Sequence, residues 1–160
     1  MTFEKVGEFC LERQNSVYSK WRMKCASNEN SEHQELLMQE NDNAILRKSQ
    51  DFALQIVFLY KNLSSQLHEY VLSKQILRSG TSIGANVKEA QCAQSRNDFY
   101  TKLYIAFKEA AETEYWLELL NAGQYLPAPD FTRLWQQNRE LLNLLGSITK
   151  NFRNPPGNNT

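Results

Sequence analysis

The stretch LSKQILRSGTSIGANVKEAQ, from Leu72 to Gln91, decides the fold predicted for this chain. On a helical wheel its apolar and small residues fall on one narrow line, which is typical of an amphipathic helix facing a core. A polar row at three- and four-residue spacing follows one side of that line, and small residues follow the other. The line holds Leu72, Ile76, Ser79, Ile83, Val87 and Ala90, the polar row Gln75, Arg78, Ser82, Asn86 and Glu89, and the small flank Ser73, Gly80 and Gly84.

Three further segments carry helical periodicity. No proline occurs before Pro127 and no stretch alternates like a strand, so long helices are predicted. They run from N-caps at Asn41–Asn43 to about residue 63, from about residue 98 to 121, and from an N-cap at Asp130 to about residue 152. Four helices of about 20 residues with short connections predict an all-α, up-down antiparallel four-helix bundle.

The bundle is expected to comprise residues 38–152, with a segment on each side of it. Residues 1–37 are charged and only loosely periodic, which fits either an additional N-terminal helix or a flexible arm. Residues 153–160, RNPPGNNT, are predicted to form a disordered tail.

Charge and cysteine content limit the classes of function. The chain has 18 basic and 18 acidic side chains, whereas a dedicated nucleic-acid binder usually carries a clear positive excess. Its three cysteines, Cys10, Cys25 and Cys92, have no C-x-x-C spacing, which favours a reducing compartment. The sequence has neither a signal peptide at its start nor an apolar run that could span a bilayer. We therefore expect a cytoplasmic protein with no membrane partner.

Residues with catalytic or metal-binding chemistry are sparse. Neither of the two histidines, His33 and His68, follows a glutamate at the Glu-x-x-His spacing of di-metal bundles. Gly80 and Gly84 lie within a helix with no strand before them, so they do not form a phosphate-binding loop. We expect no catalytic, metal or cofactor site, no small-molecule substrate and no enzymatic activity.

The two glycines of the central helix predict close helix packing. Each of Gly80 and Gly84 destabilises a helix by about 1 kcal/mol relative to alanine, so another interaction should offset that cost. Close approach of a neighbouring helix or chain is the preferred explanation, and a functional groove is the alternative.

An acidic residue lies on the apolar line predicted for the third helix. Glu114 shares that line with Phe99, Leu103, Ala106, Phe107, Ala110 and Leu117. An unpaired buried carboxylate is costly, so we predict that Arg78 or Asn86 of the polar row pairs with Glu114. Loss of Glu114 and Arg78 should then be non-additive. The alternative is that this polar row binds a ligand or RNA.

Two further sets of residues are candidates for binding. The opposite face of the third helix remains apolar, which predicts contact with a partner subunit through Ile105, Tyr115, Trp116 and Leu119. Five basic residues, expected near one end of the central helices, are candidate phosphate contacts, with a solvated surface as the alternative: Lys74, Arg78, Lys88, Arg96 and Lys102.

The segments RSGTSIGANVKEAQ and DFYTKLYIAFKEAAETEYWLELL resemble a known family. Its members are small four-helix-bundle proteins encoded in intervening sequences of bacterial 23S rRNA genes. Their pattern, close to R-S-x-T-S-I-x-A-N-x-x-E-A followed by W-L-E-L, matches Arg78, Ser79, Thr81, Ser82, Ile83, Ala85, Asn86, Glu89, Ala90 and residues 116–119. The resemblance covers roughly residues 38–150.

The resemblance implies a ring-like homo-oligomer, a pentamer, with no established enzymatic activity. Related bundles include the accessory protein of diversity-generating retroelements, which binds reverse transcriptase and RNA and is strongly basic, unlike this neutral chain. Family members begin shortly before the first bundle helix, so Met38 is either an alternative start or preceded by a lineage-specific arm.

The function expected from the sequence is a non-catalytic oligomeric scaffold that contacts RNA or a nucleic-acid enzyme such as reverse transcriptase. A self-associating protein-interaction module without a nucleic-acid role is the alternative. An enzyme that uses Glu114 is a distant third hypothesis.

Overall fold

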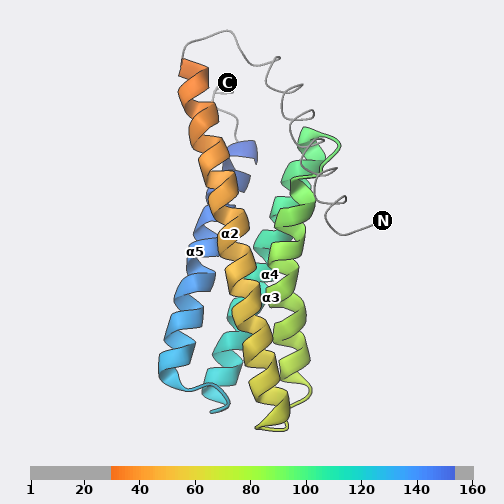
Figure 1. Ribbon diagram of the computed structural model, residues 1–160, viewed down its shortest axis with the longest axis vertical. Coiled ribbons are helices and arrows are strands. Elements are labelled where there is room, and N and C mark those ends of the chain that lie inside the picture. The colour runs from red at the N-terminus through yellow and green to blue at the C-terminus, as the bar shows by residue number, and fades with distance from the viewer. Residues whose placement is uncertain (1–29, 154–160) are drawn as a thin grey trace, which may run out of the picture.

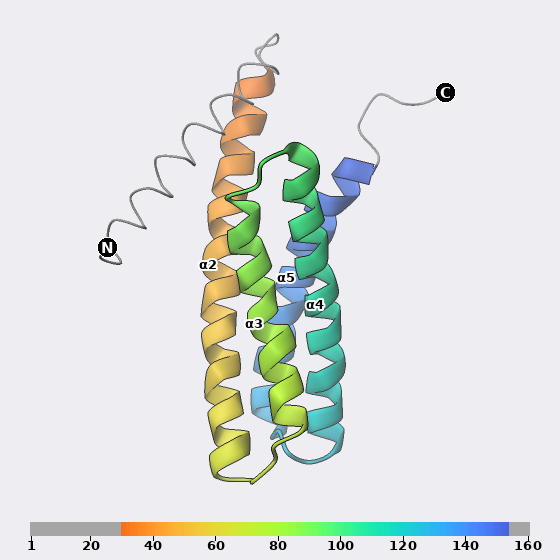
Figure 2. The ribbon, with the colours of Figure 1, turned by 90° about the vertical axis from the view of Figure 1, so that its right-hand side faces the viewer.

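The computed structural model describes the backbone from Asn30 to Arg153 and the side chains from residue 44 to residue 150. It consists of helices α2 (Asn30–Ser65), α3 (Leu72–Ala90), α4 (Arg96–Ala122) and α5 (Ala128–Arg153), with no strand in this range. Successive helices run in opposite directions, and α5 packs back against α2 (Figure 1 and Figure 2). The predicted all-α, up-down four-helix bundle is confirmed.

Helix α2 is longer than the sequence predicts. It begins at Asn30 rather than at the caps Asn41–Asn43, so it passes without interruption through the boundary placed before Met38. Neither proline nor glycine occurs between its ends, and glutamate, glutamine, leucine and methionine in its first half all favour a helix. The rest of the predicted N-terminal extension, residues 1–29, and the tail from residue 154 lie outside the described residues.

The core contains one line of side chains from each helix. On α3 the predicted line is buried from Ile76 to Ala90, whereas Leu72 at its start is half-buried. The largest side chains that are almost fully buried come from all four helices: Ile45, Phe52, Ile56, Leu63, Ile76, Ile83, Leu103, Leu117, Leu120, Leu134, Leu141 and Leu145. None of the helices within residues 30–153 is both long enough and apolar enough to cross a membrane.

The ends of α4 and α5 differ in how well the sequence predicts them. Helix α4 spans nearly the predicted range, and Ser95 caps it, since its hydroxyl accepts the Asp98 N–H at 3.1 Å. Helix α5 instead begins at Ala128, before the predicted cap Asp130. Pro127 explains the earlier start, because its restricted φ suits a helix N-terminus and its carbonyl accepts the Phe131 N–H at 2.9 Å.

The Glu69 side chain caps the N-terminus of α3. Its carboxylate accepts the backbone N–H groups of Val71 and Leu72 at 2.9 Å and of Ser73 at 2.6 Å. These donors have no partner within the helix, so the carboxylate satisfies the first turn. Burial raises the pKa of Glu69, but the hydrogen bonds from Leu72, Ser73 and Val71 together outweigh burial and lower this pKa below its ordinary value.

Replacing Glu69 by alanine should lower the free energy of unfolding at pH 7 by about 0.5–2 kcal/mol, the usual range for loss of a helix cap. Because the native pKa is lowered, the contribution of Glu69 is fully present above its unfolded pKa of about 4.3. It is lost as the pH falls through the lower native value. Urea unfolding of wild type and Glu69→Ala at several pH values should therefore converge at acid pH, and a constant difference would contradict this role.

Candidate functional site

The polar row of α3 lies along α4 and is joined to it by ion pairs at two heights. The Arg78 guanidinium pairs with Glu112, whose carboxylate also accepts the Trp116 indole N–H at 3.1 Å. Farther along α3, Glu89 pairs with Lys102. The hydrogen bond from Lys102 to Glu89 and the negative charge of that carboxylate raise the pKa of Lys102. Acidic and basic groups of α3 and α4 therefore neutralise one another where the polar row lies along α4.

The other polar residues of the row make local contacts or are partly covered. The side-chain amide of Asn86 donates to the backbone carbonyl of Ser82 at 2.9 Å, within the same helix. Gln75 and Ser82 are half-buried. The row thus contains two interhelical ion pairs and a local hydrogen bond, and it does not extend to Glu114.

Glu114 pairs with α5 rather than with the polar row, so the predicted pairing with Arg78 or Asn86 is wrong. Its Oε1 atom accepts a hydrogen bond from Nη1 of Arg139 at 3.3 Å. The buried line of α4 is centred one residue earlier, on Thr113, because α4 packs against α3 and α5 together. That difference is about 100° on a helix and turns Glu114 toward α5.

The same rotation of α4 changes other predicted core positions. Phe99 and Phe107 are half-buried, whereas Tyr100 and Thr113 are buried. The hydroxyl oxygens of Thr113 and Ser79 are 3.0 Å apart, and both side chains are fully buried. A polar contact that the sequence analysis did not identify therefore joins α3 to α4 inside the core.

The structure changes the expected outcome of the double substitution at Glu114. Glu114→Ala and Arg139→Ala should be non-additive by up to about 1 kcal/mol, because each removes the same partly exposed ion pair. Glu114→Ala and Arg78→Ala should add, since these side chains have different partners. Denaturant unfolding of both sets of variants measures the two coupling energies, and the larger coupling must belong to Arg139.

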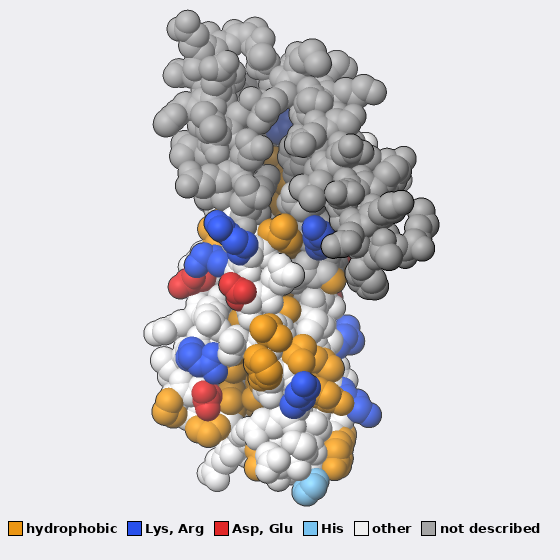
Figure 3. Space-filling view, viewed as in Figure 1, with side chains coloured by type: hydrophobic (Ala, Val, Ile, Leu, Met, Phe, Trp, Pro, Cys, Tyr) orange, Lys and Arg blue, Asp and Glu red, His pale blue; other side chains and the backbone are white. Residues whose placement is uncertain are grey.

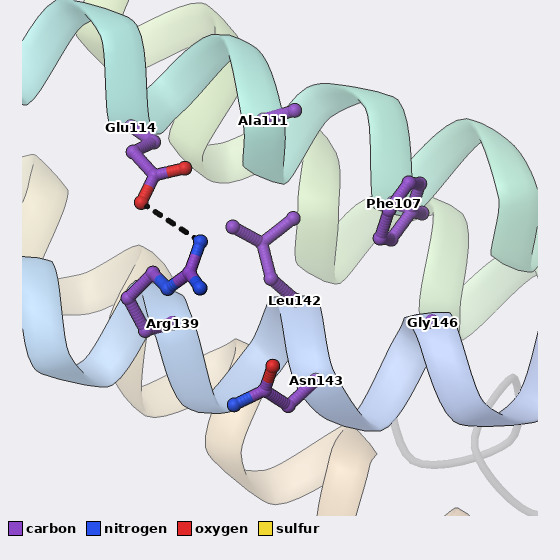
Figure 4. A pocket seen from close by; sticks show the side chains of 7 residues that line it. All are labelled: Phe107, Ala111, Glu114, Arg139, Leu142, Asn143 and Gly146. Carbon is purple, nitrogen blue, oxygen red and sulfur yellow. Dashed lines mark hydrogen bonds and ion pairs between the residues drawn. The ribbon is translucent and has the colours of Figure 1, made fainter.

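A hollow of about 430 Å³ lies beside this ion pair, between α4 and α5 (Figure 4). Glu114 and Arg139 close one end of it, and Phe107 and Gly146 lie at the other. Ala111, Leu142 and Asn143 complete the lining. Most of this lining is apolar, and its opposite charges neutralise each other. Within the described residues, no group of three or more His, Cys, Asp or Glu side chains is arranged to hold a metal ion.

Gly80 and Gly84 lie where α3 packs against α2. A Cβ atom at Gly80 would be 2.8 Å from Cγ1 of Ile56, and one at Gly84 would be 3.2 Å from the carbonyl oxygen of Ser49. Both distances are shorter than ordinary van der Waals contacts. The glycines therefore permit the close helix packing that the sequence predicts.

The five candidate phosphate contacts do not form a single cluster. Lys74 and Arg78 lie toward the start of α3, while Lys88, Arg96 and Lys102 surround the α3–α4 connection at the opposite end of the bundle. The prediction that all five lie near one end is wrong, because Lys74 and Lys88 are separated along the helix by about 20 Å. Arg96 lies 5.6 Å from the centre of the Tyr100 ring.

The predicted subunit-facing residues are only partly exposed. Tyr115 is 53% exposed and Leu119 37%, whereas Ile105 and Trp116 are half-buried and Trp116 packs against the core. The described part of helix α2 carries two large exposed apolar side chains that the sequence does not single out. These are Leu54 and Phe58, and Figure 3 shows apolar side chains gathered on this face of the bundle.

These helices define a small all-α bundle protein whose prominent surface features are exposed apolar faces and paired charges. The model of the 23S rRNA-intervening sequence protein family matches residues 41–147, and the chain belongs to this family. It is 54% identical to a protein of unknown function from the S23 ribosomal protein family of Bacteroides thetaiotaomicron VPI-5482, known from a crystal structure at 1.70 Å. The TM-score is 0.68, and the match covers 69% of this chain and 98% of that one. None of the curated proteins compared with the chain matches it.

Proposed function

We propose that this protein is a non-enzymatic, self-assembling bundle that serves as a scaffold for RNA or for a nucleic-acid enzyme such as reverse transcriptase. The observation that carries the proposal is the exposure of large apolar side chains on α2 and α4. Leu54, Phe58 and Tyr115 are 52%, 53% and 53% exposed. Clustered exposed apolar side chains mark interaction surfaces, and the family resemblance favours a pentamer.

The α3–α4 connection is the proposed RNA contact. Lys88 and Arg96 are exposed there, and Arg96 lies over the Tyr100 ring. One copy has no net charge, so a single connection would bind phosphate weakly. A ring of identical copies would repeat this pair of cations at one end, and several weak contacts to one RNA strand would then act together.

Light scattering of the purified protein and a salt titration of its binding to a mixed-sequence single-stranded RNA test the proposal. We expect an oligomer whose RNA affinity falls steeply with salt, because phosphate binding releases counterions. Lys88→Glu with Arg96→Glu should weaken RNA binding, whereas Lys74→Glu, at the opposite end, should leave it unchanged. A monomeric protein would overturn the self-assembly.

The alternative is a self-associating protein-interaction module without a nucleic-acid role. The ion pairs of Arg78 with Glu112 and of Lys102 with Glu89 support it, since they already use two of the candidate phosphate contacts. An oligomer that fails to bind the RNA at low salt would favour this alternative.

A further inference from the structure

Two exposed stripes of side chains run along α2 and α4 with the same spacing. Each stripe has five residues separated by four, three, four and three positions, which is the spacing of the a and d positions of a coiled coil. All ten side chains are exposed. The α2 stripe is Arg47, Asp51, Leu54, Phe58 and Lys61, and the α4 stripe is Tyr104, Lys108, Ala111, Tyr115 and Glu118.

The two stripes belong to diagonally opposite helices. Within the described residues, α2 and α4 each pack against α3 and α5 and make no helix–helix contact with each other. Both run in the same direction along the bundle (Figure 2). One molecule therefore presents the α2 stripe on one side and the α4 stripe on the other, with parallel helix directions.

Contacts through α3 set the relative height of the two stripes. Ile56 of α2 packs against Gly80, and the preceding residue of α3, Ser79, contacts Thr113 of α4. Ile56 and Thr113 therefore lie at nearly the same height. Equal steps along both helices from these two residues place five pairs at matching heights: Arg47 with Tyr104, Asp51 with Lys108, Leu54 with Ala111, Phe58 with Tyr115, and Lys61 with Glu118.

All five matched pairs are chemically complementary. Two join opposite charges, one sets a large apolar side chain against alanine, one joins two aromatic rings, and one sets a guanidinium beside a tyrosine. Among the described side chains, the ion pairs within the monomer leave Asp51, Lys61 and Glu118 without an oppositely charged partner. Complementary charges and apolar contacts in one register indicate that the two stripes fit each other.

We propose that the α2 stripe of one copy binds the α4 stripe of the next copy, with the helices parallel and in this register. The inference deepens the self-assembly proposed above by assigning the residues of its interface. Such an interface is heterologous, so each copy uses both stripes and assembly proceeds head to tail.

The position of the stripes on their helices favours a closed ring. The α2 stripe lies toward α5, because Asp51 and Phe58 lie one turn to either side of Gln55, which accepts a hydrogen bond from Arg133 of α5. On α4, Ala111 of the stripe lines the α4–α5 hollow. Successive copies would therefore turn in a constant direction, and head-to-tail contacts that turn in this way can close into a ring.

Two exposed-face variants test the interface in the full-length chain. Phe58→Asp should disable the α2 stripe and Tyr115→Asp the α4 stripe, so each variant alone should have the mass of a monomer by native mass spectrometry. An equimolar mixture should form a heterodimer and nothing larger, because only one functional pair of stripes remains. Leu67→Asp, which changes an exposed side chain outside both stripes, should assemble like the wild type. Circular dichroism should show wild-type helix content for all three variants.

The alternative outcomes separate this interface from self-assembly as such. A monomeric wild type would overturn both proposals. A wild-type oligomer whose two variants also assemble would overturn only the assigned interface. If Tyr115→Asp assembled while Phe58→Asp did not, the α2 stripe would bind itself or another surface, and the α2-to-α4 pairing would be wrong. A mixture that remains monomeric would also overturn that pairing.

Discussion

Replacing Gly80 by alanine is expected to lower the free energy of unfolding by about 1–3 kcal/mol, although alanine favours a helix by about 1 kcal/mol over glycine. The new Cβ would lie 2.8 Å from Cγ1 and 2.9 Å from Cγ2 of Ile56. These atoms branch directly from Cβ of Ile56 and cannot rotate away together, so α2 and α3 would have to separate. Urea unfolding followed by circular dichroism measures the loss.

Gly146 provides a matched control within α5. A Cβ there would lie 3.4 Å from Cε2 of Phe107, an ordinary contact, so Gly146→Ala should gain up to about 1 kcal/mol. Ile56→Ala should relieve the clash, so its combination with Gly80→Ala should cost clearly less than the sum of the two single changes. Equal stability of the Gly80→Ala and Gly146→Ala proteins would show that α3 does not need glycine to approach α2.

The fold could be predicted because its main determinants are local in the sequence. Helical periodicity identifies the buried line of α3 from Ile76 to Ala90, and two glycines within one helix indicate close packing. These signals depend on the geometry of a single helix, which repeats every 3.6 residues whatever its neighbours are. The cap residues Asn41–Asn43 predict too late a start for α2, because residues that favour a cap do not interrupt a helix that already runs through them.

The partners of individual side chains could not be predicted, because they depend on how each helix is rotated in the bundle. The large apolar residues Phe99 and Phe107 favour a predicted buried line of α4 that includes Glu114. In the structure α4 packs against both α3 and α5, and its buried line is centred on Thr113. A shift of one position changes the facing helix, and with it the partner of Glu114. The pairing of Arg78 with Glu112 follows from the same rotation.

The exposed stripes could be predicted only in part. The spacing from Arg47 to Lys61 is present in the sequence, but it is visible as a separate stripe only once the buried line of α2 is known. The relative height of α2 and α4 depends on contacts through α3 at Gly80 and Ser79, which no sequence pattern indicates. The family resemblance implied an oligomer, and the three-dimensional arrangement was needed to suggest its interface.

Asn138 is a buried polar residue that the sequence analysis did not identify. It is fully buried on α5, and its side-chain amide N–H donates to the carbonyl oxygen of Ala110 at 2.9 Å. Its Oδ1 atom is buried and receives no hydrogen bond from the described residues. Asn138 shares the helical line of Leu134, Leu141 and Leu145, so its spacing in the sequence already indicates a position facing the core. The sequence does not indicate that its amide bonds to Ala110 of α4, because that contact depends on the packing of two helices.

Replacing Asn138 by aspartate is expected to lower the free energy of unfolding at pH 7 by about 3–5 kcal/mol, because it places an uncompensated charge in the core. Burial would raise the native pKa of this aspartate above the unfolded value of about 3.9, so its proton is bound more tightly in the folded state. The destabilisation should therefore grow as the pH rises above about 3.9 and level off above the native pKa.

Asn138→Leu separates the charge effect from loss of the amide. Leucine removes the unpaired oxygen, and the carbonyl of Ala110 retains its place in the helical hydrogen bonding of α4, so the change should cost less than about 1.5 kcal/mol at any pH. Urea unfolding of both variants between pH 4 and pH 8 distinguishes the two effects. If leucine destabilised the protein as much as aspartate at pH 7, the hydrogen bond to Ala110 would be the dominant contribution of Asn138. A smaller, pH-independent loss for leucine and a growing loss for aspartate would show that the core tolerates an apolar residue there but not a charge.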